Sequence, residues 1–176
     1  MFRYLAITLA IAFSGCAQVQ VQTYERLDRE PDATYTASIN DEVFRIHKSK
    51  DLPNAFGNAD VFGGKTDAGT TELRFMGMTE DGQIIFRLTD IDVFTNETTM
   101  SRYGSTNSTV TATSPSRATI QTYHKPEATS RQLPPNTVEF LFDPADELLR
   151  MKGIEVRVLS VSTYEITYFL RRTTTE

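Results

Sequence analysis

Residues 71–93, TELRFMGMTEDGQIIFRLTDIDV, contain the clearest structural signal in this chain. Apolar and polar residues alternate on both sides of Asp81-Gly82, a dipeptide that favours the tight turn of a β-hairpin. A two-residue turn at this point sets Phe75 opposite Leu88 on one apolar face. The stretch therefore predicts two antiparallel strands, and the rest of the chain can be placed around them.

A second hairpin is predicted upstream of the first. Residues 35–39 and 42–47 alternate around Asn40-Asp41, two residues that tolerate positive φ. The matching register places Ala37 opposite Phe44 on an apolar face and leaves the other face polar.

Two segments next to the first hairpin carry loop signals. Residues 53–69 hold four of the nine glycines, which predicts a long loop pinned by Phe56, Val61 and Phe62. Residues 95–123 are rich in Ser and Thr, and they fit disorder or an exposed Thr-rich hairpin equally well.

The C-terminal third predicts strands at 138–142, 154–159 and 164–170. Between the first two of these strands, Asp143-Pro144 can open a short helix and Gly153 can close it. The expected fold is mainly β: an antiparallel β-sandwich or partly closed barrel of six to eight strands with one short C-terminal helix.

The composition fits one ordinary globular domain. The 176 residues include 18 Lys and Arg against 23 Asp and Glu, for a net charge of −5. No basic stripe is available to displace counterions from phosphates, so we expect no nucleic-acid partner.

The N-terminus differs from the rest of the chain. Arg3 is the only charge in residues 1–15, and an apolar run from Tyr4 to Phe13 is too short to span a bilayer but matches a secretory signal. Small residues follow, and then comes Cys16, the only cysteine. The string Phe13-Ser14-Gly15-Cys16 resembles the lipobox of bacterial lipoproteins, with Phe13 in place of the usual Leu.

This resemblance implies a lipid anchor and a location in the cell envelope. Cys16 would carry a diacylglycerol and an N-acyl chain, which together hold a protein stably on a membrane. Ala17 stands where an Asp would mark inner-membrane retention in enterobacterial lipoproteins, which favours the outer membrane, on its periplasmic side. The alternative is ordinary secretion, in which Cys16 is a passive residue near the cleavage site and is not acylated.

Three segments follow from this reading of the chain. Residues 1–15 are the lipoprotein signal peptide, 16–32 are the lipidated Cys and a flexible tether, and 33–176 are a single β-rich domain. A tether of about 15 residues could reach roughly 50 Å when fully extended.

One pair of acids is a weak candidate for chemistry. Strand alternation places Asp90 and Asp92 on the apolar face, where two carboxylates could bind a metal or share acid/base work, with Glu97 the nearest further acid. A bulge near Thr89 would instead turn both acids to solvent, and we favour the bulge because an unpaired buried carboxylate is costly.

No other motif predicts catalysis. The string from Gly57 to Thr66 ends like a phosphate-binding loop but has Ala59 at the position that needs glycine, so it is read as a surface loop. His47 is expected on a polar face, and His124 has no neighbour in sequence that would make it a metal ligand or a catalytic base.

The leading hypothesis is therefore a non-enzymatic outer-membrane lipoprotein without a cofactor, a binding or structural module. It would bind another envelope component, such as another envelope protein, through its exposed strands or through the 53–69 and 95–123 loops. The alternatives are an envelope hydrolase or metal-dependent enzyme using Asp90 and Asp92, and a small-ligand-binding β-barrel.

Overall fold

The computed structural model describes residues 19–103, 105–114, 117–125 and 128–173. Twelve strands and two short helical turns make up this part of the chain. The strands are β1 (Thr23–Leu27), β2 (Ala33–Ser38), β3 (Glu42–Asp51), β4 (Lys65–Met78), β5 (Ile84–Thr95), β6 (Ser105–Ser114), β7 (Arg117–Lys125), β8 (Ser130–Gln132), β9 (Asn136–Phe142), β10 (Leu148–Met151), β11 (Ile154–Val161) and β12 (Glu165–Arg172). The helical turns are α1 (Thr99–Tyr103) and a 3-10 turn at Pro144–Asp146.

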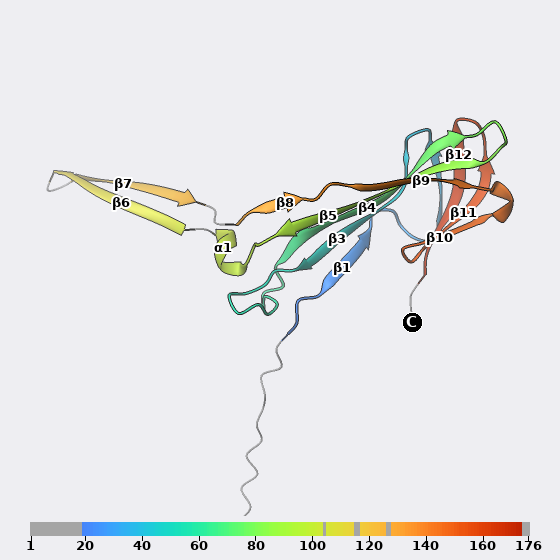
Figure 1. Ribbon diagram of the computed structural model, residues 1–176. Coiled ribbons are helices and arrows are strands. Elements are labelled where there is room, and N and C mark those ends of the chain that lie inside the picture. Colours follow the sequence, from blue (N-terminus) through green and yellow to red (C-terminus); the bar gives the residue numbers. More distant parts are fainter. Residues whose placement is uncertain (1–18, 104, 115–116, 126–127, 174–176) are drawn as a thin grey trace, which may run out of the picture.

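The strands form three antiparallel sheets. A six-stranded sheet runs in the order β1-β3-β4-β5-β8, with β9 also paired to β5, and a four-stranded sheet runs in the order β10-β11-β12-β2. The four-stranded sheet, called the smaller sheet below, packs against one end of the six-stranded or larger sheet. The third sheet, the β6–β7 hairpin, projects from the opposite end (Figure 1). The mainly β, antiparallel fold is confirmed, with more strands than the expected six to eight.

The core lies between the two larger sheets. Alternate residues of each strand point inward, as the period of two in the sequence requires. The fully buried side chains come from both sheets, with Phe44, Leu73, Phe75 and Phe86 on one side and Tyr168 on the other. The space that a ligand-binding barrel would leave open is filled by these side chains.

The β4–β5 hairpin is confirmed, but its register differs from the expected one. The turn is a three-residue loop in which Gly82, at φ 83°, donates its N–H to the Thr79 carbonyl at 3.1 Å. A second irregularity between Phe75 and Gly77 adds one more residue to β4. Phe75 therefore lies opposite Phe86 and not opposite Leu88. The shift is two residues, so the predicted inward face is retained.

The predicted hairpin at 35–47 is wrong in its pairing. β2 pairs with β12 in the smaller sheet, and β3 pairs with β1 and β4 in the larger sheet. Asn40, at φ 67°, turns the chain from one sheet to the other. Ala37 and Phe44 both face the core, as expected, but from opposite sheets.

The predicted C-terminal helix is also corrected. Asp143 caps only the single 3-10 turn, where its Oδ1 accepts from the Ala145 N–H at 2.9 Å. Glu147 ends this turn, the next four residues form strand β10, and Gly153, at φ 70°, lies in the tight turn into β11. Leu148 and Leu149 pair with β11 in the sheet, and this pairing competes successfully with a helical continuation.

The segment predicted as a flexible tether contains a strand. β1 pairs with β3 from Thr23 opposite Lys50 to Leu27 opposite Ile46. Just before β1, the Gln22 N–H donates to Asp51 Oδ2 at 3.1 Å. Any tether must therefore end before residue 22. Residues 1–15 and Cys16 lie outside the described part of the chain.

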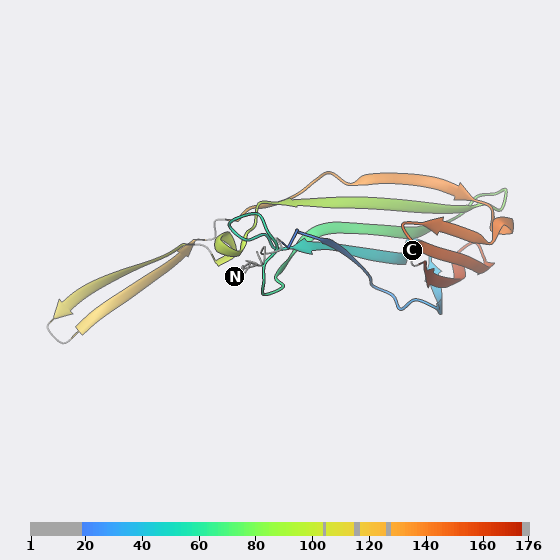
Figure 2. The same ribbon diagram turned by 90° about the horizontal axis from the view of Figure 1, so that it is seen from below.

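The described residues of the Thr-rich segment form the exposed hairpin, which is one of the two alternatives. β6 and β7 pair with each other only, with Val110 opposite Ile120. We call residues 105–125 the arm. It leaves the body next to α1 and returns to β8, and both views show it clear of the two packed sheets (Figures 1 and 2).

Candidate functional site

Asp90 and Asp92 lie on the same face of the larger sheet as the core residue Phe86, because β5 pairs without a bulge at Thr89 with both β4 and β9. The favoured bulge is therefore wrong. The core ends before this point, so the Asp90 side chain is 23% exposed and the Asp92 side chain is 65% exposed. Lys48, two residues beyond the core residue Ile46 on β3, reaches both carboxylates: it forms a close ion pair with Asp90 and bonds Asp92 Oδ1 at 2.8 Å. The two acids are neutralised by an amine and are not left open as a pair.

Further donors complete the surroundings of Asp90. Thr71 Oγ1 donates at 2.8 Å, and Lys152 Nζ, from the turn before β11, lies at 3.3 Å. Burial opposes the ionisation of Asp90, but the hydrogen bonds from Lys48, Thr71 and Lys152 outweigh it and hold the pKa of Asp90 below its ordinary value. Lys152 lies in the turn that connects β10 and β11 of the smaller sheet, so the cluster joins the two sheets where the apolar core ends.

Glu97 does not join these acids. Arg102 Nε donates to Glu97 Oε1 at 2.7 Å, and Thr66 Oγ1 donates to Oε2 at 2.7 Å. The hydrogen bond from Arg102 lowers the pKa of Glu97. Arg102 also donates to the Lys65 carbonyl at 2.7 Å, so the pair fixes α1 on the start of β4. Among the described residues, no group of three or more His, Cys, Asp and Glu side chains is placed to hold a metal.

The two histidines lie in different sheets. His47 is on the outer, polar face of β3, as predicted, and its Nε2 lies 2.9 Å from Asp28 Oδ2. His124 belongs to β7 in the arm. The string from Gly57 to Thr66 forms a loop that runs into strand β4 and not into a helix, so it lacks the helix N-terminus of a phosphate-binding loop.

The most distinctive surface lies where the N-terminal segment, a loop and α1 meet. We call this region the tether end and define it as Val19, residues 52–64 and α1. The Ala59 N–H donates to the Val19 carbonyl at 2.8 Å, and the Thr99 N–H donates to the Pro53 carbonyl at 2.9 Å. These bonds fix the loop between the segment that follows Cys16 and the base of the arm.

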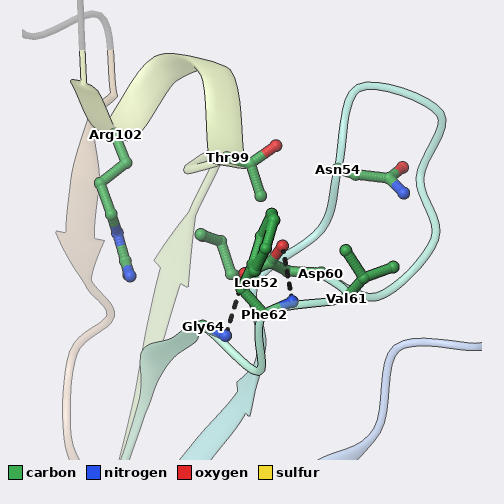
Figure 3. Close-up of a pocket in the computed structure, with 8 residues that line it drawn as sticks. All are labelled: Leu52, Asn54, Asp60, Val61, Phe62, Gly64, Thr99 and Arg102. Carbon is green, nitrogen blue, oxygen red and sulfur yellow. Dashed lines mark hydrogen bonds between the residues drawn. The ribbon is translucent and has the colours of Figure 1, made fainter.

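An open pocket of about 500 Å³ lies at the tether end (Figure 3). Its lining residues come from the loop and α1: Leu52, Asn54, Asp60, Val61, Phe62, Gly64, Thr99 and Arg102. Arg102 is engaged by Glu97, and Asp60 accepts two backbone N–H groups of its own loop. The charged groups of the pocket are thus engaged in hydrogen bonds within the protein, and the remaining surface of the pocket is largely apolar.

The predicted pinning role of Phe56, Val61 and Phe62 is wrong. All three side chains are exposed, at 89%, 84% and 93% respectively. The loop is held by its own polar groups and not by burial of these side chains. A repeat in the sequence, Asn-Ala-Phe-Gly-Asn at 54–58 and Asp-Val-Phe-Gly-Gly at 60–64, could have indicated this arrangement.

The arm presents the second unusual surface. Val110 and Ile120 form an exposed cross-strand pair on one face, and Tyr123 is exposed on the other. Each strand of the arm has one partner only, so the outer edge of each strand has unpaired backbone groups.

Comparison with known proteins gives no relative: no family model, no curated protein and no solved structure matches this chain. Within the part of the chain that the structure describes, no helix is long and apolar enough to cross a membrane.

Proposed function

We propose that this protein is a lipid-anchored binding module of the bacterial outer membrane, held on the periplasmic side through Cys16, with the arm as its binding element. The lipobox-like string that ends at Cys16 supports the proposed lipid anchor and the proposed location in the cell envelope. The arm is the observation that carries the binding function. We propose a non-enzymatic role, which is supported by the ion pairs that Asp90 and Glu97 form with Lys48, Lys152 and Arg102.

An arm of this kind is best explained by a partner. A two-stranded hairpin alone is only marginally stable in water, and the described side chains of the arm are exposed. A protein strand that adds to one of its edges would complete the backbone hydrogen bonds and cover the pair of Val110 and Ile120. No Asp or Glu occurs between Glu97 and Glu127, whereas Arg117 and Lys125 lie in the arm. The charge therefore favours a neutral or acidic partner surface.

The anchor is tested by intact mass and by fractionation after expression in an enterobacterial host. We expect the mature chain to begin at Cys16 and to carry the mass of three acyl chains, and Cys16→Ser to abolish the modification. Ala17→Asp should move the acylated protein from the outer to the inner membrane. An unacylated mature chain would refute the anchor.

The binding role is tested by photocrosslinking in intact envelopes. A photoreactive residue at Ile120, on the arm, should form a discrete adduct with another envelope protein. The control is Tyr164, which is similarly exposed (72% against 67%) but lies on the body. We expect the adduct to weaken in Cys16→Ala, because anchoring brings the partners together. Equal crosslinking at both positions would argue against the arm.

A further inference from the structure

The loop at the tether end consists of two copies of one turn. In each copy the first side chain, Asn54 or Asp60, accepts from the backbone N–H groups two and four residues later. The distances are 2.9 and 3.1 Å for Asn54 and 3.2 and 3.0 Å for Asp60. Each copy then presents a Phe, followed by a glycine at φ 79° or 71°. This backbone conformation suits glycine.

The backbone of this loop is well satisfied internally. The N–H groups of residues 56–60 and 62–64 donate to Asn54, Asp60, Leu52 or Val19. Asp60 is the only charged side chain in residues 52–64, and it points into its own turn (Figure 3). The outward surface of the loop is therefore apolar and exposes few unpaired donors.

Those properties match the boundary between water and lipid. An apolar side chain gains free energy there in proportion to its buried area, and aromatic rings favour the headgroup level. Backbone donors without partners would make insertion costly, but the two turns have already paired most of theirs. In water alone, two phenylalanines and a valine held almost fully exposed have no evident benefit.

The position of the loop identifies which lipid surface it meets. The Ala59 N–H is bonded to the Val19 carbonyl, and Cys16 is three residues before Val19 in sequence. Three residues span at most about 11 Å. An acyl group on Cys16 would thus place the bilayer surface close to the two turns.

We propose that Phe56, Val61 and Phe62 insert into the interface of the membrane that holds Cys16. This inference rests on the proposed lipid anchor for its geometry. The loop acts as a second, non-covalent contact, which fixes how the body and the arm are oriented on the membrane.

A fluorescence experiment tests this contact, because the chain has no tryptophan. Phe62→Trp introduces a single reporter on the loop, and Tyr164→Trp is the matched control on an exposed site of the body. Full-length acylated proteins are reconstituted into vesicles of phosphatidylethanolamine and phosphatidylglycerol, with and without brominated lipid. We expect about a twofold or larger loss of Phe62→Trp emission, since interfacial groups lie about 5–10 Å into the headgroup region. Tyr164→Trp should be unaffected.

Equal responses of the two reporters would overturn the contact. Phe56→Trp repeats the test on the second turn, and it must respond as Phe62→Trp does. The mass of each protein shows separately whether Cys16 is acylated. If it is not, the proposed anchor fails, and the same variants coupled through the Cys16 thiol to a maleimide lipid still decide whether the loop inserts.

Discussion

Replacing Tyr168 by Phe should lower the free energy of unfolding by about 1–3 kcal/mol at neutral pH. The Tyr168 side chain is fully buried on β12, and its hydroxyl donates to the Val43 carbonyl on β3 at 2.5 Å. Val43 is the extra residue of a bulge, because β4 pairs with Glu42 and Phe44 and passes over it. The hydroxyl therefore satisfies a buried bulge carbonyl and joins the two sheets, and Phe would leave that carbonyl without this donor.

The same group predicts the alkaline dependence. Burial raises the pKa of Tyr168 above its ordinary value of 10.0, so the native state keeps a proton that the unfolded chain loses near pH 10. The resulting stabilisation is complete below pH 10 and is lost as the pH rises toward the higher native pKa. At pH 11, which is one pH unit above the pKa of tyrosine in the unfolded chain, the loss is about 1.4 kcal/mol. Phe has no such group, so the deficit of the variant should shrink by about 1.4 kcal/mol between pH 9 and pH 11.

Urea unfolding followed by circular dichroism measures both effects. The control is Tyr164→Phe, which removes an exposed hydroxyl and should change the free energy of unfolding by less than about 0.5 kcal/mol. The reasoning is refuted if the two variants are equally stable at neutral pH, or if the deficit of Tyr168→Phe grows as the pH rises.

Three further predictions concern stability. Gly69→Ala should cost about 2–4 kcal/mol in thermal unfolding, because Gly69 has φ 126° and a Cβ there would lie 2.0 Å from the Ile91 carbonyl oxygen. Asp90→Asn should cost about 1–2 kcal/mol in urea unfolding at pH 7 by weakening the bonds to Lys48. It should also flatten the acid limb, since the lowered pKa of Asp90 gives stability that is present above pH 3.8 and lost below it; an unchanged acid limb would contradict this. Replacing residues 105–125 by a short Gly-Ser linker should change the unfolding of the body by less than about 0.5 kcal/mol, because the arm pairs only with itself; a larger loss would show that the body depends on it.

The sequence predicted which residues face inward better than it predicted which strands pair. Alternation assigned Phe75, Ala37 and Phe44 to apolar faces, and all three are buried. Pairing depends on distant segments, so a local turn signal can mislead. Asn40-Asp41 resembles a hairpin turn but connects two sheets, because β12, more than a hundred residues away, pairs with β2.

The register error in the main hairpin has a local cause. Asp81-Gly82 predicted a two-residue turn, but the loop has three residues and β4 has a bulge before Gly77. Each adds one residue to the same side of the hairpin. The two shifts together preserve which side chains face inward, so core burial cannot reveal either of them.

The candidate site was harder to predict, because its key residues do not follow the usual rule that apolar side chains are buried and charged side chains are exposed. Phe56 and Phe62 are apolar, which led to the expectation that they pin the loop in the core, yet both are exposed. The polar residues Asn54 and Asp60 hold the loop instead. For Asp90 the error was the reverse: burial seemed too costly, because Lys48, 42 positions earlier in the chain, was not foreseen as its partner.

The pairing of β1 changes what anchoring at Cys16 implies. A flexible tether ending at residue 32 would let the body move roughly 50 Å from the membrane. In the structure, Val19 is already bonded to the loop and Thr23 is already in the sheet, and the three residues from Cys16 to Val19 can span at most about 11 Å. Under the proposed anchor, three acyl chains would provide enough affinity without help from the loop. The contribution that we propose for Phe56 and Phe62 is then orientation: one covalent and one apolar contact side by side would keep the body from tumbling freely and would present the arm to a partner from a restricted set of directions.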